Sequence, residues 1–376
     1  MSKLVIVGGS KGIGFTILSI LYSKYKQVVL FDLVSPIKWF PNVSFKKIDL
    51  SKDNIYICKD DVQSADTLII TAGIGQVKPF EDTDVVEIKK TFSINTISTV
   101  ILIKFFYERL LESKESKCLV FSSIAGEVSS PLFATYGSSK ASISKLCESL
   151  NIELLKNGSS NRITCIEAVS FQGTSFSGGQ TDISKLNDIA KECICAMDSK
   201  ETIHLINDEL CKDIINRYNN DKAAFGESSF DYKMKSGRVN KKKSTVIGYL
   251  SGTFDLFHIG HLNLLKRAKE QCDYLIVGVH KSGSWKGKET FIPFEERLEI
   301  IKSIRFVDEA DESFEEDSDA WNKYHYDKLF VGSDYKGSER FKKYEEYFKD
   351  KGVEIVYFPY TNGTSSTQLR EKILKK

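Results

Sequence analysis

One stretch near the start of the chain decides the fold: residues 4–14 read LVIVGGSKGIG. A β-branched apolar run at residues 4–7 leads into a loop rich in glycine at residues 8–14. Glycines let the backbone of such a loop approach a pyrophosphate, and the helix that follows presents its N-terminal amides to the phosphates. The stretch therefore predicts a strand, a dinucleotide-binding turn and a helix.

Further short apolar runs alternate with longer amphipathic stretches. They lie at residues 28–31, 67–70, 118–121 and 163–168, and again at 245–250, 274–279, 328–331 and 353–358. Strands that alternate with helices predict parallel sheets with right-handed crossovers. We expect an α/β protein with two doubly wound, Rossmann-like domains: residues 1–222 and residues 245–376, joined by a polar linker at residues 223–244 that contains Gly226, Gly237 and three consecutive lysines.

Composition excludes several classes of partner. The 376 residues include 53 Lys and Arg against 51 Asp and Glu, so no general basic field exists to hold nucleic acid or an anionic membrane. The apolar run at residues 4–7 is too short for a signal peptide or membrane span, which favours a cytoplasmic protein. The eight cysteines are scattered, and the close pair Cys193 and Cys195 lacks zinc-site spacing, so we expect reduced thiols and no protein metal site.

Two residues of the first domain bear on the choice of cofactor. Asp32 follows Gly14 by 18 residues, at the end of the second expected strand. A carboxylate there accepts hydrogen bonds from the adenosine ribose and repels a 2′-phosphate, which favours NAD. Lys11, in contrast, is a cation within the glycine loop that can accept a 2′-phosphate, which favours NADP. NAD is the preferred prediction, and NADP stays open.

A tyrosine and a lysine, Tyr136 and Lys140, lie four residues apart on an expected helix. Residues at this spacing share a helix face, and the ammonium is expected to lower the pKa of the phenol. The spacing also occurs at Tyr218 and Lys222 among other places, where we interpret it as coincidence. The setting distinguishes Tyr136, because Ser123 precedes it by 13 residues, directly after an expected strand.

Residues 1 to about 175 resemble the short-chain dehydrogenase/reductases, on the glycine loop, Asp32, Asp49-Leu50, Thr71-Ala72-Gly73, Asn95, Ser123 and the Tyr136/Lys140 pair. The resemblance implies Tyr136 as general acid, Lys140 as ribose ligand, Ser123 as the residue that polarises the carbonyl and Asn95 as the holder of a relay water. It implies cofactor contacts from Gly8, Ser10, Lys11, Gly12, Ile13, Gly14, Asp32, Asp49, Ala72, Gly73, Tyr136 and Lys140. The family's usual Pro-Gly pair is missing from Val169 to Thr174.

The second domain opens with a different motif. Its first expected strand runs into Ser251-Gly-Thr-Phe-Asp-Leu-Phe-His258-Ile-Gly-His261, followed by a helical stretch. Gly260 permits close approach of a phosphate, and two imidazoles at a helix start can donate hydrogen bonds to it. A metal site is the weaker interpretation, because no third ligand stands at metal-site spacing. The motif predicts phosphoryl or nucleotidyl transfer.

Residues 245–376 resemble glycerol-3-phosphate cytidylyltransferase and its relatives that act on phosphocholine and phosphoethanolamine. Beyond the histidine motif, the matching segments include 293–297, 305–309 and 331–334. The resemblance implies attack of a substrate phosphate on CTP with Mg²⁺, and catalytic roles for His258, His261 and Lys288, with Asp255 as an orienting residue. It implies CTP contacts from Gly252, Thr253, Phe254, His258, His261, Lys288, Asp334, Ser365, Ser366 and Thr367. Tyr360 stands where the family has arginine, so another cation substitutes or the substrate differs.

A carbonyl reductase joined to a cytidylyltransferase suggests two successive steps. We expect reduction of a keto-sugar phosphate, such as ribulose 5-phosphate, to an alditol phosphate. Conversion to a CDP-alditol of the CDP-ribitol or CDP-glycerol type for a surface polysaccharide would follow. The alternatives are a cytidylyltransferase whose reductase-like half serves oligomerisation or sensing, and a nucleotide-binding regulator without turnover. A homodimer or homotetramer is expected for either enzyme family.

Overall fold

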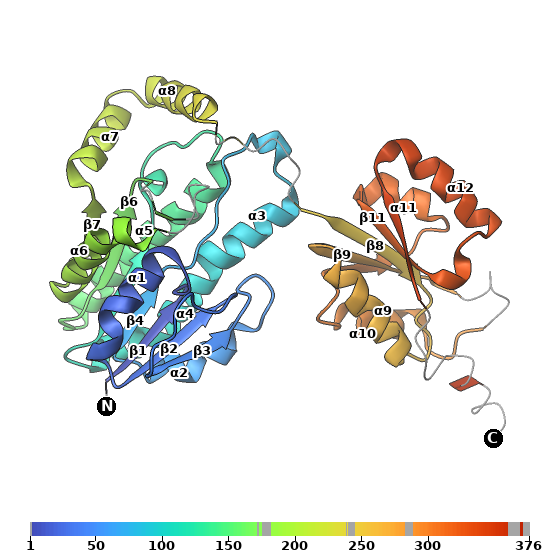
Figure 1. Cartoon of the computed structure of the whole chain (residues 1–376), viewed down its shortest axis with the longest axis horizontal. Helices are drawn as coiled ribbons and strands as arrows, with labels where there is room; N and C mark the ends of the chain where they lie inside the picture. Colours follow the sequence, from blue (N-terminus) through green and yellow to red (C-terminus); the bar gives the residue numbers. More distant parts are fainter. Residues whose placement is uncertain are drawn as a thin grey trace. The chain divides into compact units, whose positions relative to one another are not determined.

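The structure is a computed structural model of the chain. It describes residues 2–170, 173–174, 182–237, 239, 245–282, 289–359 and 369–370. The chain divides into two compact units, residues 1–242 and 243–376. Each unit is an α/β domain built on its own parallel sheet, as the alternation of strands and helices predicted (Figure 1).

The described part of the first unit contains a seven-stranded sheet in the order β3-β2-β1-β4-β5-β6-β7. The strands are β1 (Lys3–Val7), β2 (Gln27–Asp32), β3 (Val43–Lys47), β4 (Thr67–Ile70), β5 (Lys117–Phe121), β6 (Ile163–Ala168) and β7 (Ile203–Ile206). The helices are α1 (Gly12–Leu21), α2 (Lys59–Gln63), α3 (Val85–Phe92), α4 (Ser98–Glu112), α5 (Ala134–Lys156), α6 (Asn187–Asp198), α7 (Asp208–Asn220) and α8 (Lys222–Lys235).

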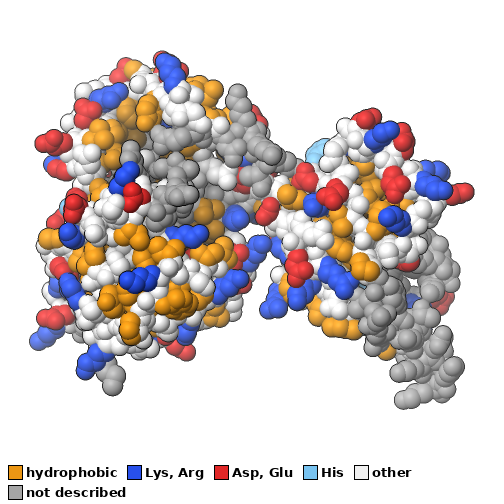
Figure 2. All heavy atoms as spheres, in the orientation of Figure 1, with side chains coloured by type: hydrophobic (Ala, Val, Ile, Leu, Met, Phe, Trp, Pro, Cys, Tyr) orange, Lys and Arg blue, Asp and Glu red, His pale blue; other side chains and the backbone are white. Residues whose placement is uncertain are grey.

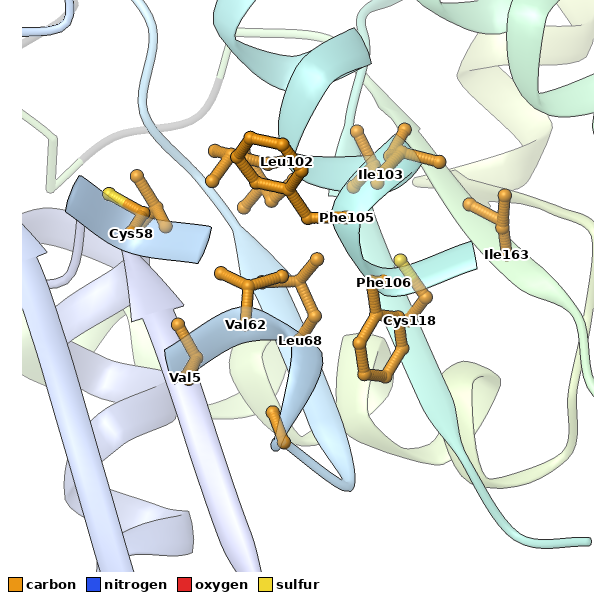
Figure 3. Close-up of a cluster of buried hydrophobic side chains, with 14 of the residues drawn as sticks. Val5, Cys58, Val62, Leu68, Leu102, Ile103, Phe105, Phe106, Cys118 and Ile163 are labelled. Carbon is orange, nitrogen blue, oxygen red and sulfur yellow. The ribbon is translucent and has the colours of Figure 1, made fainter. Parts of the chain in front are cut away.

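Strand β1 shows why the sheet is buried on both faces. Successive side chains of a strand point to opposite faces, so Val5 and Val7 join one apolar cluster while Leu4 and Ile6 join the other. The first cluster packs α2, α4 and α5 against the sheet, with Val62, Leu68 and Phe106 at its centre (Figure 3). The second packs α1 and α6 on the opposite face. Continuous apolar strands are typical of such two-sided burial.

The described part of the second unit contains a five-stranded parallel sheet in the order β10-β9-β8-β11-β12. The strands are β8 (Ile247–Gly252), β9 (Tyr274–Val279), β10 (Glu309–Glu312), β11 (Lys328–Gly332) and β12 (Glu354–Phe358). The helices are α9 (Ile259–Glu270), α10 (Phe294–Lys302), α11 (Asp317–Tyr324) and α12 (Glu339–Phe348). Helices α9 and α10 cover the face that contains Leu250, and α11 and α12 cover the face that contains Tyr249.

The polar segment expected as an interdomain linker, residues 223–244, is helical over much of its length. Helix α8 begins after Asp221, whose carboxylate accepts hydrogen bonds from the amides of Ala223 and Ala224. Lys233 of α8 donates through Nζ to Ser130 Oγ at 2.8 Å and to the Pro131 carbonyl at 2.9 Å. These contacts tie the helix to the first unit, so the boundary between the units falls after residue 242.

The surface and the cysteines agree with the composition. Figure 2 shows acidic and basic side chains interspersed on the visible face of each unit, without a region of one sign. Of the helices in the described ranges, none has the length and apolar content that a membrane crossing requires. All eight cysteines are free thiols, and most are buried.

Candidate active sites

The first candidate site lies at the carboxyl ends of β1 and β4. These neighbouring strands pair in parallel, and the chain continues to β2 on one side and to β5 on the other. The loops after β1 and β4 diverge at such a switch point and leave a crevice between them, where ligands of doubly wound sheets bind. The glycine loop and the segment Thr71-Ala72-Gly73 lie against each other at this end of the sheet, where Thr71 Oγ1 donates to the Gly8 carbonyl at 2.7 Å.

The glycine loop is folded in a way that excludes side chains. Gly8 has a φ of +92°, and a Cβ on it would lie 2.4 Å from the Ala72 amide nitrogen. A Cβ on Gly14 would lie 2.3 Å from Thr71 Oγ1. At the start of α1, Lys11 makes no side-chain cap, so the first amides of the helix stay available for a ligand. These features fit a bound dinucleotide pyrophosphate at Gly12, Ile13 and their neighbours.

Asp32 anchors this loop to the end of β2. Its Oδ2 accepts a hydrogen bond from the Ser10 amide at 2.9 Å, and its Oδ1 accepts one from the Leu33 amide at 2.7 Å. Ser10 Oγ in turn donates to the Val34 carbonyl at 2.6 Å. Lys11 is exposed on the same loop. The carboxylate thus has a structural task in addition to the ribose contact that its position predicts.

The catalytic tyrosine predicted from the sequence lies on α5 and is buried. Tyr136 stacks on Phe133 with 4.2 Å between ring centroids, and its phenol hydrogen-bonds Ser123. Burial raises the pKa of Tyr136 to about 12, and the bond with Ser123 opposes that rise. Tyr136 and Ser123 therefore contact each other, and the phenol carries its proton at neutral pH.

Lys140 differs from the expectation that it lowers the pKa of the tyrosine. Its Nζ donates to the Phe121 carbonyl at 2.7 Å and lies 5.8 Å from the centroid of the Tyr136 ring. Burial lowers the pKa of Lys140 itself to about 8. Burial is the largest influence on both groups, and it shifts the pKa of the phenol upward and the pKa of the ammonium downward.

Asn95 is held by more hydrogen bonds than the sequence suggested. It belongs to a π-helical turn, Ser93–Ile97, a distortion that often marks functional sites. Its Nδ2 donates to the Ile74 carbonyl at 2.8 Å and to Ser139 Oγ at 2.9 Å, and its Oδ1 accepts from the Ile74 amide at 2.9 Å. A Cβ on Gly73 would lie 3.3 Å from Lys140 Nζ and 3.5 Å from Asn95 Oδ1. Gly73 therefore brings the backbone against both groups.

Asp49 follows β3 at the expected place for an adenine contact. Its Oδ1 accepts hydrogen bonds from the Ser51 amide at 2.9 Å and from Ser51 Oγ at 2.6 Å. The side chain is partly exposed, and its bonds with Ser51 form a local turn after β3.

The second candidate site lies after β8, which pairs with β9 on one side and β11 on the other. His258 caps α9, and its Nδ1 accepts a hydrogen bond from the Gly260 amide at 3.0 Å. That bond requires an unprotonated Nδ1, so the neutral imidazole carries its hydrogen on Nε2. The rings of His258 and His261 stack 4.0 Å apart, and burial lowers the pKa of His258. The motif therefore presents a neutral donor at a helix N-terminus.

Two arginines that the sequence analysis did not single out hold the loops of this site in place. Arg297 is fully buried and donates to the carbonyls of Thr253 at 2.5 Å, His280 at 2.8 Å, Lys281 at 2.9 Å and Ile292 at 2.9 Å. It therefore ties the loop after β8 to the loop after β9. Its place in the segment 293–297 was the available signal, although a buried role cannot be read from that spacing.

Arg370 is the second of these arginines. Its Nη2 lies 2.5 Å from Asp255 Oδ2, and its Nη1 donates to the Glu289 carbonyl at 2.6 Å. Asp255 is 3% exposed and also accepts from the amides of Phe291 and Ile292. Asp255 thus joins three segments of the domain, and this is how it would orient the groups of the site.

The other predicted nucleotide-binding residues divide into two groups. Gly252 ends β8, Thr253 follows it, and Phe254 has a φ of +53° with its ring edge against His261. Asp334 lies in a short turn after β11, where a Cβ on Gly332 would meet its carboxylate. Lys288, Ser365, Ser366 and Thr367 lie outside the described residues.

Comparison with known proteins also divides the chain into two domains. The family model for short chain dehydrogenases matches residues 2–177, and the cytidylyltransferase-like model matches residues 249–372. Glycerol-3-phosphate cytidylyltransferase of Bacillus spizizenii is 38% identical over 124 residues, which make up 32% of this chain and 91% of that protein. The chain joins a short-chain dehydrogenase to a cytidylyltransferase.

The dehydrogenase domain has more distant relatives. Dehydrogenase RED2 of Cochliobolus heterostrophus is 27% identical over 168 residues, 43% of this chain and 63% of that protein. A short chain dehydrogenase from Burkholderia cenocepacia, solved in complex with NADP, is 17% identical with a TM-score of 0.51, over 61% of this chain and 97% of that one. This second likeness concerns the fold of the domain.

Proposed function

We propose that the chain catalyses two successive reactions. The dehydrogenase domain reduces a keto-sugar phosphate, ribulose 5-phosphate being the preferred example, to an alditol phosphate with NAD(P)H. The cytidylyltransferase domain then joins CMP from CTP to that phosphate, giving a CDP-alditol for a surface polysaccharide and releasing pyrophosphate. One observation supports the proposal: a buried Tyr136 phenol bonded to Ser123 and a stacked His258/His261 pair at the start of a helix occur in one chain.

In the reductase step, the residues present fit proton delivery to a carbonyl oxygen. A bound nicotinamide supplies the hydride that the carbonyl carbon receives. Tyr136 holds its proton because burial raises the pKa of the phenol to about 12, and it gives that proton to the oxygen as negative charge develops there. Ser123 would donate to the same oxygen, and Lys140, whose Nζ lies 5.8 Å from the centroid of the Tyr136 ring, would hold the ribose of a bound nicotinamide.

Cofactor preference follows from Asp32. Its carboxylate lies at the end of β2 and already accepts from Ser10 and Leu33. A 2′-phosphate there would meet that negative charge, so we propose NAD rather than NADP. The NADP in the Burkholderia structure belongs to a protein that is 17% identical.

In the transfer step, the substrate phosphate oxygen attacks the α-phosphorus of CTP and pyrophosphate leaves. His258 donates from Nε2 to the α-phosphoryl oxygens, since its Nδ1 is engaged by Gly260. Such fixed donors stabilise charge in the transition state without reorganisation. Mg²⁺ would come with the triphosphate, as is usual for this ion, which keeps several waters and binds substrate phosphates.

Arg370 is a candidate for the cation that Tyr360 does not supply. It lies against Asp255, next to the strand that carries the histidine motif. An arginine there can add positive charge for an anionic substrate in place of the family arginine.

The experiment is pyrophosphate release from CTP and Mg²⁺ with a panel of alditol phosphates, run in parallel with the matching ketose phosphates. We expect turnover of one alditol phosphate, and of its ketose phosphate only when NADH is added. NADPH in place of NADH should be the poorer reductant. Transfer to phosphocholine or phosphoethanolamine alone would contradict the two-step proposal.

A further inference from the structure

A buried carboxyl group lies behind the reductase site. Glu167 is 2% exposed on β6, and its Oε1 lies 2.8 Å from Ser144 Oγ of α5. Ser144 Oγ lies 2.7 Å from Ser122 Oγ, which lies 2.9 Å from the main-chain oxygen of Lys140. Ser122 and Ser144 are each 5% exposed. A continuous row of polar contacts therefore links Glu167 on β6 to the main chain of Lys140, the residue whose side-chain ammonium lies near Tyr136.

Counting hydrogens in this row determines the state of the acid. The three contacts need three hydrogens, and the two serine hydroxyls supply only two. If Ser122 donates to the Lys140 oxygen and Ser144 donates to Ser122, the third hydrogen must come from Glu167. Were Glu167 ionised, one contact would join two oxygen atoms with no hydrogen between them, which is costly in a buried position.

A neighbouring acidic group also favours the protonated form of Glu167. The carboxyl of Glu127, which follows the Ile124–Gly126 turn, is close enough to hydrogen-bond Glu167, and two carboxyls can do so only when one is protonated. Lys145 of α5 opposes this effect, while the thiols of Cys165 on β6 and Cys211 on α7 also face the group. Burial is the largest influence, and it raises the pKa of Glu167 to about 7, although the hydrogen bond with Ser144 opposes the rise.

We propose that Glu167 is held as the neutral acid and, through Ser144 and Ser122, acts as a positioning residue for Lys140 and hence for Tyr136. The acid touches neither substrate nor cofactor. Loss of its proton removes one link of the row, which loosens the start of α5 against β5. Reduction should therefore decline as pH rises through the titration of Glu167, below the range in which Lys140 itself loses its charge.

Activity measurements test this with matched variants. Glu167→Gln keeps a donor to Ser144 that does not titrate, so its reduction rate should lack the decline near pH 7 that the wild type shows. Glu167→Leu has no donor and should lose about tenfold in kcat at every pH. Glu127→Gln removes the neighbour that raises the pKa, so the decline should move to lower pH. Glu153→Gln, an exposed acid on α5, should leave the wild-type profile unchanged.

A second measurement needs no substrate, so it separates failure of this proposal from failure of the proposed substrate. The infrared C=O band of a protonated carboxyl should be present in the wild-type chain near pH 6 and missing from Glu167→Gln. Thermal unfolding adds a check for Glu167→Leu, which must show a cooperative transition. The same decline of activity in Glu167→Gln as in the wild type, or identical carboxyl bands, would overturn the proposal.

Discussion

At the scale of single residues, Tyr136 owes its chemistry to burial. Removing its hydroxyl with Tyr136→Phe should lower the rate of ketose phosphate reduction about 1,000-fold, because the proton donor is lost while the ring stack on Phe133 remains. NADH oxidation measures the loss, and pyrophosphate release from CTP should be unaffected. Tyr218→Phe is the matched control, since Tyr218 also precedes a lysine by four residues but lies on α7. A loss of both activities in Tyr136→Phe would contradict independent sites.

For cytidylyl transfer, the corresponding prediction concerns His258 and the dependence of the transfer rate on pH. Protonation of Nδ1 would break its bond with the Gly260 amide, and burial lowers the pKa at which this happens below the usual value of about 6.5. The rate should therefore stay level around neutral pH and fall only in buffer more acidic than that usual imidazole pKa.

Substitution of the neighbouring imidazole gives the second part of that test. His261→Ala should abolish pyrophosphate release and leave reduction intact. His325→Ala is the control, because His325 is exposed beside Trp321. If the rate of cytidylyl transfer falls as the pH rises through 7, the protonated imidazole is the active form and the prediction is wrong.

At the scale of elements, Arg297 on α10 shows how one side chain can fix two loops. Arg297→Lys would leave several of its four carbonyl acceptors without donors in a fully buried position. We expect a loss of about 3 kcal/mol in the stability of the second unit, because an ammonium cannot reproduce the planar fork. Calorimetry should show a lower Tm for one transition only.

Arg267→Lys provides the comparison for that variant. Arg267 makes a single main-chain bond, to the Pro359 carbonyl, so its replacement should change the Tm little. If both variants behave alike, the carbonyl network around Arg297 does not support the loops.

At the scale of the whole molecule, the two units should work independently of each other's chemistry. A mixture of Tyr136→Phe and His261→Ala chains should convert a ketose phosphate, NADH and CTP to a CDP-alditol, since each chain retains one intact site. The product can be followed by anion-exchange chromatography. A mixture that stays inactive, although each variant retains its remaining activity, would mean that the alditol phosphate must pass within one chain.

The sequence by itself determined the two doubly wound sheets, and it also predicted the main site residues. Short-range patterns suffice for these, because a β-branched run, a glycine turn and a helix start each depend on neighbouring residues. Predicted strands such as β1, β6 and β9 lie within two residues of their observed bounds. Strand β10 escaped prediction because its residues, Glu309–Glu312, are mostly acidic, and α8 because its polar composition is also typical of a linker.

Only the tertiary structure decided the electrostatics and the long-range contacts. The lowered pKa of Lys140, the protonated phenol of Tyr136 and the row from Glu167 to Lys140 all depend on how deeply the groups are buried. Arg370 meets Asp255 across 115 positions of the chain. Desolvation and pairing over such separations arise from packing, which no local pattern of residues encodes.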